Sequence, residues 1–223
     1  MMPRRGNPLS SRAMTVLRAI VMVAAATVLA VSVSAATGDA DHPRGGGDMS
    51  RYLGGQLLVA TRRMGDPRLA ETVIYMVQHD AGGAMGLVVN RVIGSGPLAK
   101  FLKGVGIEAA GIEGKIRLHY GGPVEIGRGF ALHSGDFHGD GTVRLPGDVS
   151  MSALLQVLKA AAAGEGPERV LFLFGYAGWA PGQLENEIKR QDWVTAPADI
   201  ELIFDGDEET KWHRALSRAG LKL

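Results

Sequence analysis

The sequence predicts an α+β fold built on mixed β-sheets, and three observations support this class. Strand-like and helix-like segments are interspersed along the chain without the regular alternation of a parallel βαβ fold. Gly is abundant, at 32 residues, which predicts many tight turns. The chain has 223 residues, 46% of them hydrophobic, which suffices for a sizeable core in one domain with an extension, or in two small domains.

Three strand-like segments open the body of the chain. Residues 54–60 are predicted as a first strand, and 72–79 form a β-branched and aromatic run typical of a second. Asp80-Ala81-Gly82-Gly83 predicts a hairpin turn, after which 84–90 return as a third strand. We expect these three strands to share one sheet.

The middle of the chain alternates short elements with glycine-rich loops. A proline in its first turn and a glycine after its end predict a short helix over 97–103. Strands are predicted at 115–120 and 128–133, and a short edge strand at 142–145 after the loop 134–141. The segment Gly121-Gly122-Pro123 is predicted as a tight bend, because it lacks the Lys-Ser/Thr of a phosphate-binding loop.

The C-terminal part is predicted to be richer in helix. Leucines at helical spacing predict a helix over 150–163, and a continuous apolar run predicts a buried strand over 170–174. Further elements are predicted as a helix at 181–190, a strand at 200–204 and a final helix at 207–219. Asp207 is the expected N-cap of that last helix.

The densest cluster of uncommon chemistry spans residues 174–188. It is predicted as the end of a buried strand, a glycine-aromatic turn and a short helix that has Gln183 and Glu187 on one face. With Tyr176 and Trp179, these residues are our candidate surface for a ligand or a partner. The alternative interpretation is a strand-to-helix corner in which Trp179 fills the core and the charged residues face solvent.

Three polar residues at strand ends extend the candidate surface. His79, Asn90 and His133 each end a predicted strand, and they could converge on one pocket if their strands are neighbours. The alternative is structural: Asn fixes turns through bonds to the backbone, and a buried His is usually a satisfied framework residue.

Composition excludes several kinds of site. The chain has no Cys, so it has no disulfide, no thiolate metal site and no Cys nucleophile. No Ser lies in a Gly-x-Ser-x-Gly motif. The nearest approach to a metal-ligand pattern is His133, Asp136, His138 and Asp140, but most of these lie in a glycine-rich loop. We therefore predict no catalytic residue, no metal and no cofactor.

The N-terminal segment predicts export. Basic residues precede an apolar run of 15 residues, Ala19 to Val33, and a small-residue exit at Val33-Ser34-Ala35. This order is typical of a secretory signal peptide, and the run is shorter than the roughly 20 residues of a membrane-spanning helix. We expect a cleaved signal peptide at 1–35, a flexible linker at 36–53 and a folded domain at 54–223. Membrane attachment would arise only from an uncleaved signal.

The expected compartment is the periplasm; the alternative is a cytoplasmic protein whose translation starts at Met49. Net charge bears on the partners. Residues 1–48 hold five Arg and three Asp, which leaves 19 basic and 20 acidic residues in the remainder. A body with a net charge of −1 offers no electrostatic footprint for nucleic acid.

Four motifs in order carry a family resemblance over about three-quarters of the chain. The opening strand is followed by Gly83-Ala84-Met85-Gly86-Leu87-Val88-Val89-Asn90. The later motifs are Gly121-Gly122-Pro123-Val124 with Arg128-Gly129-Phe130-Ala131-Leu132-His133, then Gly175-Tyr176-Ala177-Gly178-Trp179 with Gly182-Gln183-Leu184-Glu185, and Ala196-Pro197-Ala198-Asp199. Together they resemble the YqgE/AlgH family, also called UPF0301. The resemblance implies a compact α+β fold of mixed, barrel-like sheets with flanking short helices, and no established activity.

The leading functional hypothesis is a non-enzymatic binding or regulatory protein that recognises a small molecule or another protein. One alternative is a hydrolase-like enzyme that uses the strand-end His79 or His133 with a carboxylate. A second is a cytosolic, nucleic-acid-linked transcriptional regulator, which both the charge of the body and the expected export disfavour. The sequence predicts no oligomeric state.

Overall fold

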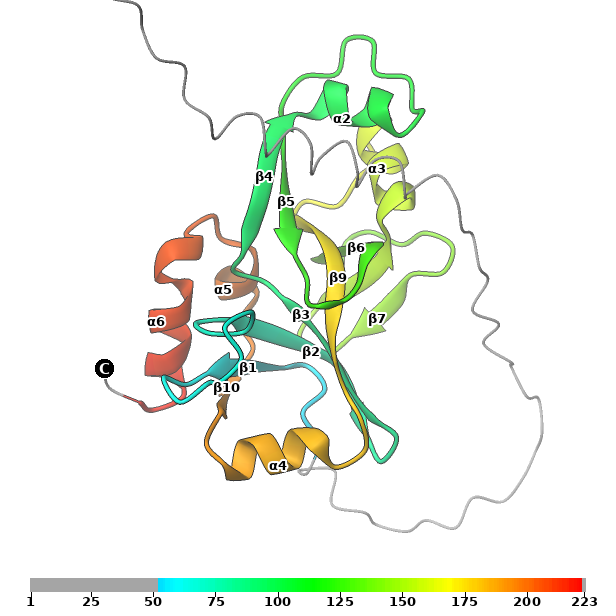
Figure 1. Cartoon of the computed structure of the whole chain (residues 1–223). Helices are drawn as coiled ribbons and strands as arrows, with labels where there is room; N and C mark the ends of the chain where they lie inside the picture. The colour runs from blue at the N-terminus through cyan, green and yellow to red at the C-terminus, as the bar shows by residue number, and fades with distance from the viewer. Residues whose placement is uncertain (1–51, 222–223) are drawn as a thin grey trace, which may run out of the picture.

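A computed structural model of the chain describes residues 52–221 (Figure 1). The predicted signal peptide at 1–35, Met49 and most of the predicted linker lie outside this range. Ten strands and five helices lie within it, and the strands form a curled, half-barrel sheet with short helices around it. The predicted α+β class is therefore confirmed. No helix of residues 52–221 is both long and apolar enough to cross a membrane.

The first three predicted strands share one antiparallel sheet, as expected. They are β1 (Gln56–Ala60), β2 (Val73–Asp80) and β3 (Gly83–Val88), in the order β1-β2-β3. A late strand, β10 (Trp193–Pro197), pairs antiparallel with the outer side of β1. The β2–β3 ladder contains a register shift between Met76 and Gln78, and bulges of this kind increase the twist that lets a sheet curl.

The central strand is β9 (Val170–Trp179), which joins the two halves of the sheet (Figure 1). Its first half pairs in parallel with β5 (Lys115–Tyr120) and antiparallel with β6 (Val124–Ser134), while its second half pairs with β3. The predicted turn after residue 174 was wrong, because β9 continues through it. Gly175 has φ +74° at the change of partner, so the glycine bends the strand without ending it.

The predicted helix 150–163 is divided between two elements. Residues Val149–Ala153 form β8, which pairs with β6 and with the edge strand β7 (Val143–Leu145), and only Leu154–Ala162 form helix α3. The helical leucine spacing begins at Leu154. In the preceding residues, Ser150 and Ser152 are buried and pair with β6. They are two residues apart, which is the spacing of side chains on one face of a strand and not the 3.6-residue period of a helix.

Strand β4 (Val92–Pro97) was not predicted. It contains two glycines and ends in a proline, residue types that weaken the strand pattern. It pairs only with β5, and its proline leads into α2 (Leu98–Gly104), which matches the predicted helix 97–103 within a residue.

Residues 200–204 form a helix, α5 (Ile200–Phe204), and the predicted strand there was wrong. An apolar run of this length is compatible with either element. Asp199 decides the outcome, because its carboxylate accepts the N–H groups of Glu201 (2.8 Å) and Leu202 (3.4 Å) as an N-cap. The final helix α6 (Glu208–Arg218) is confirmed, and the predicted cap Asp207 accepts from the Thr210 N–H over 3.2 Å.

Three hydrophobic clusters form the core of the part of the chain that the structure describes. One lies between the first sheet half and α6, and a second lies under α2 and α3. The third lies under helix α4 (Gln183–Lys189) and includes Leu184, Trp179 and Trp193. Figure 1 shows α4 below the lower end of β9, so the third cluster holds this helix against the strand end.

Candidate functional site

A cleft of about 560 Å³ opens where four segments meet at the lower end of β9. Its walls come from the loop after β1, the bend before β6, the last residues of β9 and the outer face of α4. The residues that line it are Arg63, Met64, Gly65, Asp66, Arg68, Leu69, Pro123, Val124, Ala177, Gly178, Trp179, Gln183, Glu187, Arg190 and Asp192. Of the predicted surface residues, the cleft thus contains Trp179, Gln183 and Glu187.

The carboxylate of Glu187 is held by two tryptophans. The indole N–H groups of Trp179 and Trp193 both donate to Oε2 of Glu187, each over 2.8 Å. The two rings meet edge to face, with centroids 6.0 Å apart. Both indoles are buried, and a buried indole N–H requires an acceptor. One oxygen of Glu187 therefore accepts hydrogen bonds from two buried donors of the core, and the same side chain borders the cleft.

Gln183 donates a third hydrogen bond to the carboxylate of Glu187. Its Nε2 donates to Oε1 of Glu187 over 3.0 Å, and its Oε1 accepts the N–H of Ala180 over 3.0 Å. Gln183 and Glu187 are one helical turn apart, as predicted, and Leu184 is buried beneath them. Gly182 precedes the helix with φ +75°, a conformation that directs the chain from the strand end into α4.

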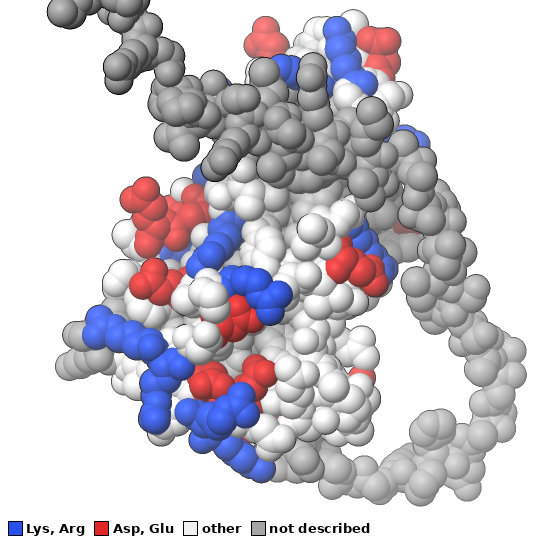
Figure 2. Space-filling model, viewed as in Figure 1, with Lys and Arg blue, Asp and Glu red and all other residues white. Residues whose placement is uncertain are grey.

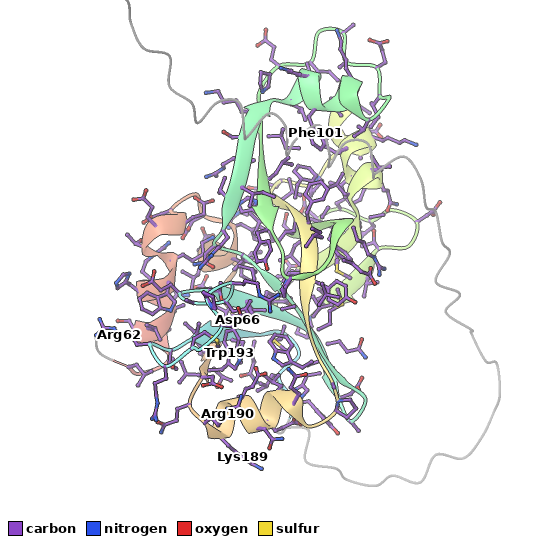
Figure 3. All side chains as sticks on the ribbon, viewed as in Figure 1. Arg62, Asp66, Phe101, Lys189, Arg190 and Trp193 are labelled. Atoms are coloured by element: carbon purple, nitrogen blue, oxygen red, sulfur yellow. The ribbon has the colours of Figure 1, made fainter. Side chains whose placement is uncertain are left out.

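Arginines and carboxylates alternate around the rim of the cleft. Arg68 and Asp66 form a two-pronged ion pair with a shortest distance of 2.7 Å, and Arg190 pairs with Asp192 over 2.9 Å. The Arg68 hydrogen bond lowers the pKa of Asp66 below its ordinary value. Figure 2 shows Lys and Arg side chains gathered with carboxylates at the lower left of the molecule, and Figure 3 places Asp66, Arg190 and Trp193 in this region.

Tyr176 lies outside the cleft. Its ring packs edge to face on Phe130, and its hydroxyl donates to Glu125 over 3.5 Å. Because successive side chains of a strand point to opposite faces, Tyr176 and Trp179 lie on different sides of β9. The structure separates these two members of the predicted surface.

Asn90 has a structural role at the end of β3. Its Oδ1 accepts the Val73 N–H over 2.8 Å, and its Nδ2 donates to the Glu71 carbonyl over 2.9 Å. Glu71 has φ +55°, so the amide of Asn90 fixes an uncommon backbone conformation before β2. This is the turn-fixing alternative that the sequence left open.

His79, Asn90 and His133 do not converge on one pocket. That arrangement required their strands to be neighbours. His133 lies opposite Val170, whereas His79 lies opposite Ala84, which in turn pairs with Trp179. Val170 and Trp179 are the two ends of β9, so the two histidines lie beside opposite ends of that strand. Asn90 follows the opposite end of the β2–β3 pair from His79.

Both imidazoles are buried in the framework. Nδ1 of His79 accepts the Leu53 N–H over 3.2 Å, and its Nε2 lies 3.4 Å from Glu185. His133 lies 2.9 Å from the Ser152 hydroxyl and 2.8 Å from its neighbour's carbonyl, and Ser152 contacts Thr142 over 2.8 Å. Ser152 and both histidines are buried.

The polar residues of the loop after His133 bond to each other and to neighbouring segments. Asp136 accepts hydrogen bonds from the Ser134 hydroxyl (2.5 Å) and the Glu168 N–H (2.9 Å), while His138 lies 3.2 Å from Arg144. Within residues 52–221, no three His, Asp or Glu side chains are arranged to hold a metal ion.

Sequence reasoning missed Arg63, Arg68, Arg190 and Trp193 as parts of the site. The arginines belong to a loop and a helix end that are more than 120 residues apart, so their proximity is a tertiary property. Trp193 carried a usable signal, because a large residue with a polar tip implies an acceptor nearby once it is buried.

The sequence matches the model of the family described as AlgH-like over residues 57–223. A UPF0301 protein of Methylococcus capsulatus is 50% identical over 181 residues, covering 81% of this chain and 97% of that protein. A UPF0301 protein of Rhodospirillum rubrum is 43% identical over 170 residues, covering 76% and 88% of the two chains.

Two solved structures are similar. The solution structure of the AlgH protein from Pseudomonas aeruginosa has a TM-score of 0.63 at 38% identity, covering 83% of this chain and 94% of that one. A crystal structure of a Corynebacterium diphtheriae protein has a TM-score of 0.58 at 21% identity, covering 74% and 86%, and this similarity concerns the fold alone.

Proposed function

This chain belongs to the AlgH-like family, and from that premise and the geometry of the cleft we propose that it has a binding or regulatory role, with its ligand in the cleft beside α4. The family resemblance carries no established activity, so the support comes from the site itself. A cleft of this size is within the usual range for small-molecule sites.

The observation that carries the proposal is the state of the Glu187 carboxylate. A carboxylate has about four acceptor positions. Three donors occupy Glu187, and all three are neutral groups of Trp179, Trp193 and Gln183. No Lys, Arg or His of residues 52–221 lies within ion-pair distance of it. A rigid, partly buried carboxylate without a cation favours a ligand that brings a hydrogen-bond donor or a positive charge.

The hydrolase-like alternative gains no support from the cleft. Neither His79 nor His133 lines it, and both imidazoles are engaged in the framework. A general base must reach the proton that it abstracts. Binding thus fits the arrangement of these side chains better than catalysis.

A fragment screen on the ¹⁵N-labelled full chain tests the proposal. We expect small molecules with an amine or amide donor to shift the indole N–H resonances of both Trp179 and Trp193. Glu187→Gln should weaken such binding by about tenfold, the ratio for losing one charge-assisted hydrogen bond. Glu113→Gln, at an exposed loop position, is the matched control. The proposal fails if no fragment moves both indole resonances, or if Glu187→Gln binds the hits as tightly as the parent chain.

A further inference from the structure

The cleft continues into a second hollow at the end of α4. This hollow has a volume of about 460 Å³ and is lined by Arg63, Lys189, Arg190, Gln191 and Asp192. Arg63, Arg190 and Asp192 line both spaces, so one ligand could extend from one into the other. We call the three cations Arg63, Lys189 and Arg190 the basic shelf.

The basic shelf has an excess of positive charge. Among residues 52–221, Asp192 is the only carboxylate lining this hollow, and it is already paired with Arg190 over 2.9 Å. Within residues 52–221, neither Arg63 nor Lys189 has a carboxylate within ion-pair distance. Figure 3 labels Lys189 and Arg190 at the end of α4.

Hydrogen bonds around Gln191 preorganise the basic shelf. Arg63 Nη1 donates to Gln191 Oε1 over 2.6 Å, and the Thr61 hydroxyl donates to the Gln191 carbonyl over 2.6 Å. The Thr61 N–H also donates to the Asp192 carbonyl over 2.9 Å. Gln191 has φ +65°, a left-handed conformation that is uncommon for a residue with a side chain. These bonds fasten the loop to the helix end, and the guanidinium of Arg63 is held there by one N–H of its five.

We infer that the ligand of the cleft carries an oxyanionic group, either a phosphate or a carboxylate. This group binds on the basic shelf, while the rest of the ligand extends toward Glu187. This inference rests on the proposed function, because the shelf is the continuation of the same cleft. Guanidinium groups match the geometry of phosphate and carboxylate oxygens, and an ammonium adds a further charge.

A small ligand fits the shelf better than a nucleic-acid strand does. Asp66 and Asp192 lie beside the shelf cations, so a continuous phosphate backbone would meet like charges on either side. A nucleic-acid surface is usually an extended basic stripe on a positively charged domain, whereas residues 49–223 carry a net charge of −1.

The test is a titration of the ¹⁵N-labelled full chain with inorganic phosphate, succinate and a short single-stranded DNA. We expect phosphate or succinate to shift the amide resonances of residues 61–63 and 189–192. The double variant Arg63→Gln/Lys189→Gln should weaken this binding by at least about tenfold. Lys100→Gln/Lys103→Gln removes two exposed cations of α2 and should leave it unchanged. Unchanged indole resonances of Trp179 and Trp193 in the double variant would establish that its fold is intact.

Each other outcome overturns the inference. The inference fails if neither anion shifts the shelf amides, if the shifts spread equally to α2, or if only the DNA binds. The fragment screen keeps the two proposals apart. If donor fragments move both indole resonances and no oxyanion binds the shelf, the cleft is a binding site without an anion subsite. If oxyanions bind the shelf and no fragment moves the indoles, the proposed function at Glu187 fails instead.

Discussion

The indole N–H of Trp193 donates to Oε2 of Glu187 over 2.8 Å, and this bond fastens strand β10 to helix α4 beneath the cleft. Trp193 is 1% exposed, so its N–H has no access to bulk water. The same carboxylate oxygen accepts the N–H of Trp179 at the end of β9. Three elements from different parts of the chain therefore meet on one oxygen atom.

Glu187→Ala should lower the free energy of unfolding by about 1–3 kcal/mol, the cost of leaving buried donors without a partner. Glu187→Gln should cost less, because its amide oxygen still accepts. Urea unfolding followed by circular dichroism measures both changes without relying on tryptophan fluorescence. Glu113→Ala, at an exposed loop position, should change stability by less than about 0.5 kcal/mol. Equal effects of Glu187→Ala and Glu113→Ala would contradict the structural role of the carboxylate.

Gly121→Ala should be strongly destabilising, because a Cβ at this position would lie 2.2 Å from the carbonyl oxygen of Gly175. The obstacle is backbone, which has no rotamer to change, so we expect a loss of about 3 kcal/mol or a chain that does not fold. Gly96→Ala is the control, because nothing lies within 4 Å of its Cβ position. A thermal midpoint of Gly121→Ala equal to that of Gly96→Ala would show that the bend and β9 are farther apart than described.

Stability should fall as the pH drops below about 6.5, through His119 and His133. Burial lowers the pKa of both imidazoles from the ordinary value of 6.5, and for His119 it outweighs the opposing effect of Glu208 at 3.5 Å. The unfolded chain therefore binds more protons than the folded chain below pH 6.5, and the free energy of unfolding decreases on acidification.

Urea midpoints between pH 7.5 and pH 5 measure this slope. The double variant His119→Gln/His133→Gln should flatten it, because it removes both of the imidazoles whose pKa burial lowers. The carboxylates with lowered pKa, among them Asp199 and Asp205, titrate below 3.8 and do not contribute in this range. An unchanged slope in the double variant would contradict the assignment to these two histidines.

Asp199→Ala should destabilise the chain by about 1 kcal/mol more than Asp199→Ser does, because only serine keeps an N-cap acceptor for α5. Both variants lose the ion pair with Arg218, so the difference between them isolates the cap. Chemical denaturation of the two variants provides the comparison. Identical stabilities would mean that residues 200–204 do not depend on this cap.

Cleavage of the predicted signal should leave a mature protein that begins at Ala36. The reason is the basic start, apolar run and small-residue exit of the first 35 residues. The intact mass of the protein recovered from the periplasmic fraction checks this expectation. A protein in the cytoplasmic fraction whose mass matches a chain that begins at Met49 would favour the alternative translation start.

Local patterns predicted the elements that local physics controls. The β-branched run and glycine turn of residues 72–90 specify the β2–β3 hairpin, because side-chain alternation and turn conformation are properties of neighbouring residues. The spacing of Gln183, Leu184 and Glu187 fixed which residues face outward on α4, and Asp207 was identified as the cap of α6. Where an apolar run fitted two elements, as at 200–204, a cap outside the run decided between them.

By itself, the sequence determined the family, the α+β class, and the presence of Trp179, Gln183 and Glu187 in one local cluster. Only the tertiary structure decided which distant residues join them. The bend of β9 at Gly175 and the pairing of β10 with β1 bring Trp193 and the loop with Arg63 to the same helix. The same sheet register places His79, Asn90 and His133 at separate places. The physical reason is that strand pairing depends on contacts between residues far apart in the chain, which no local pattern specifies.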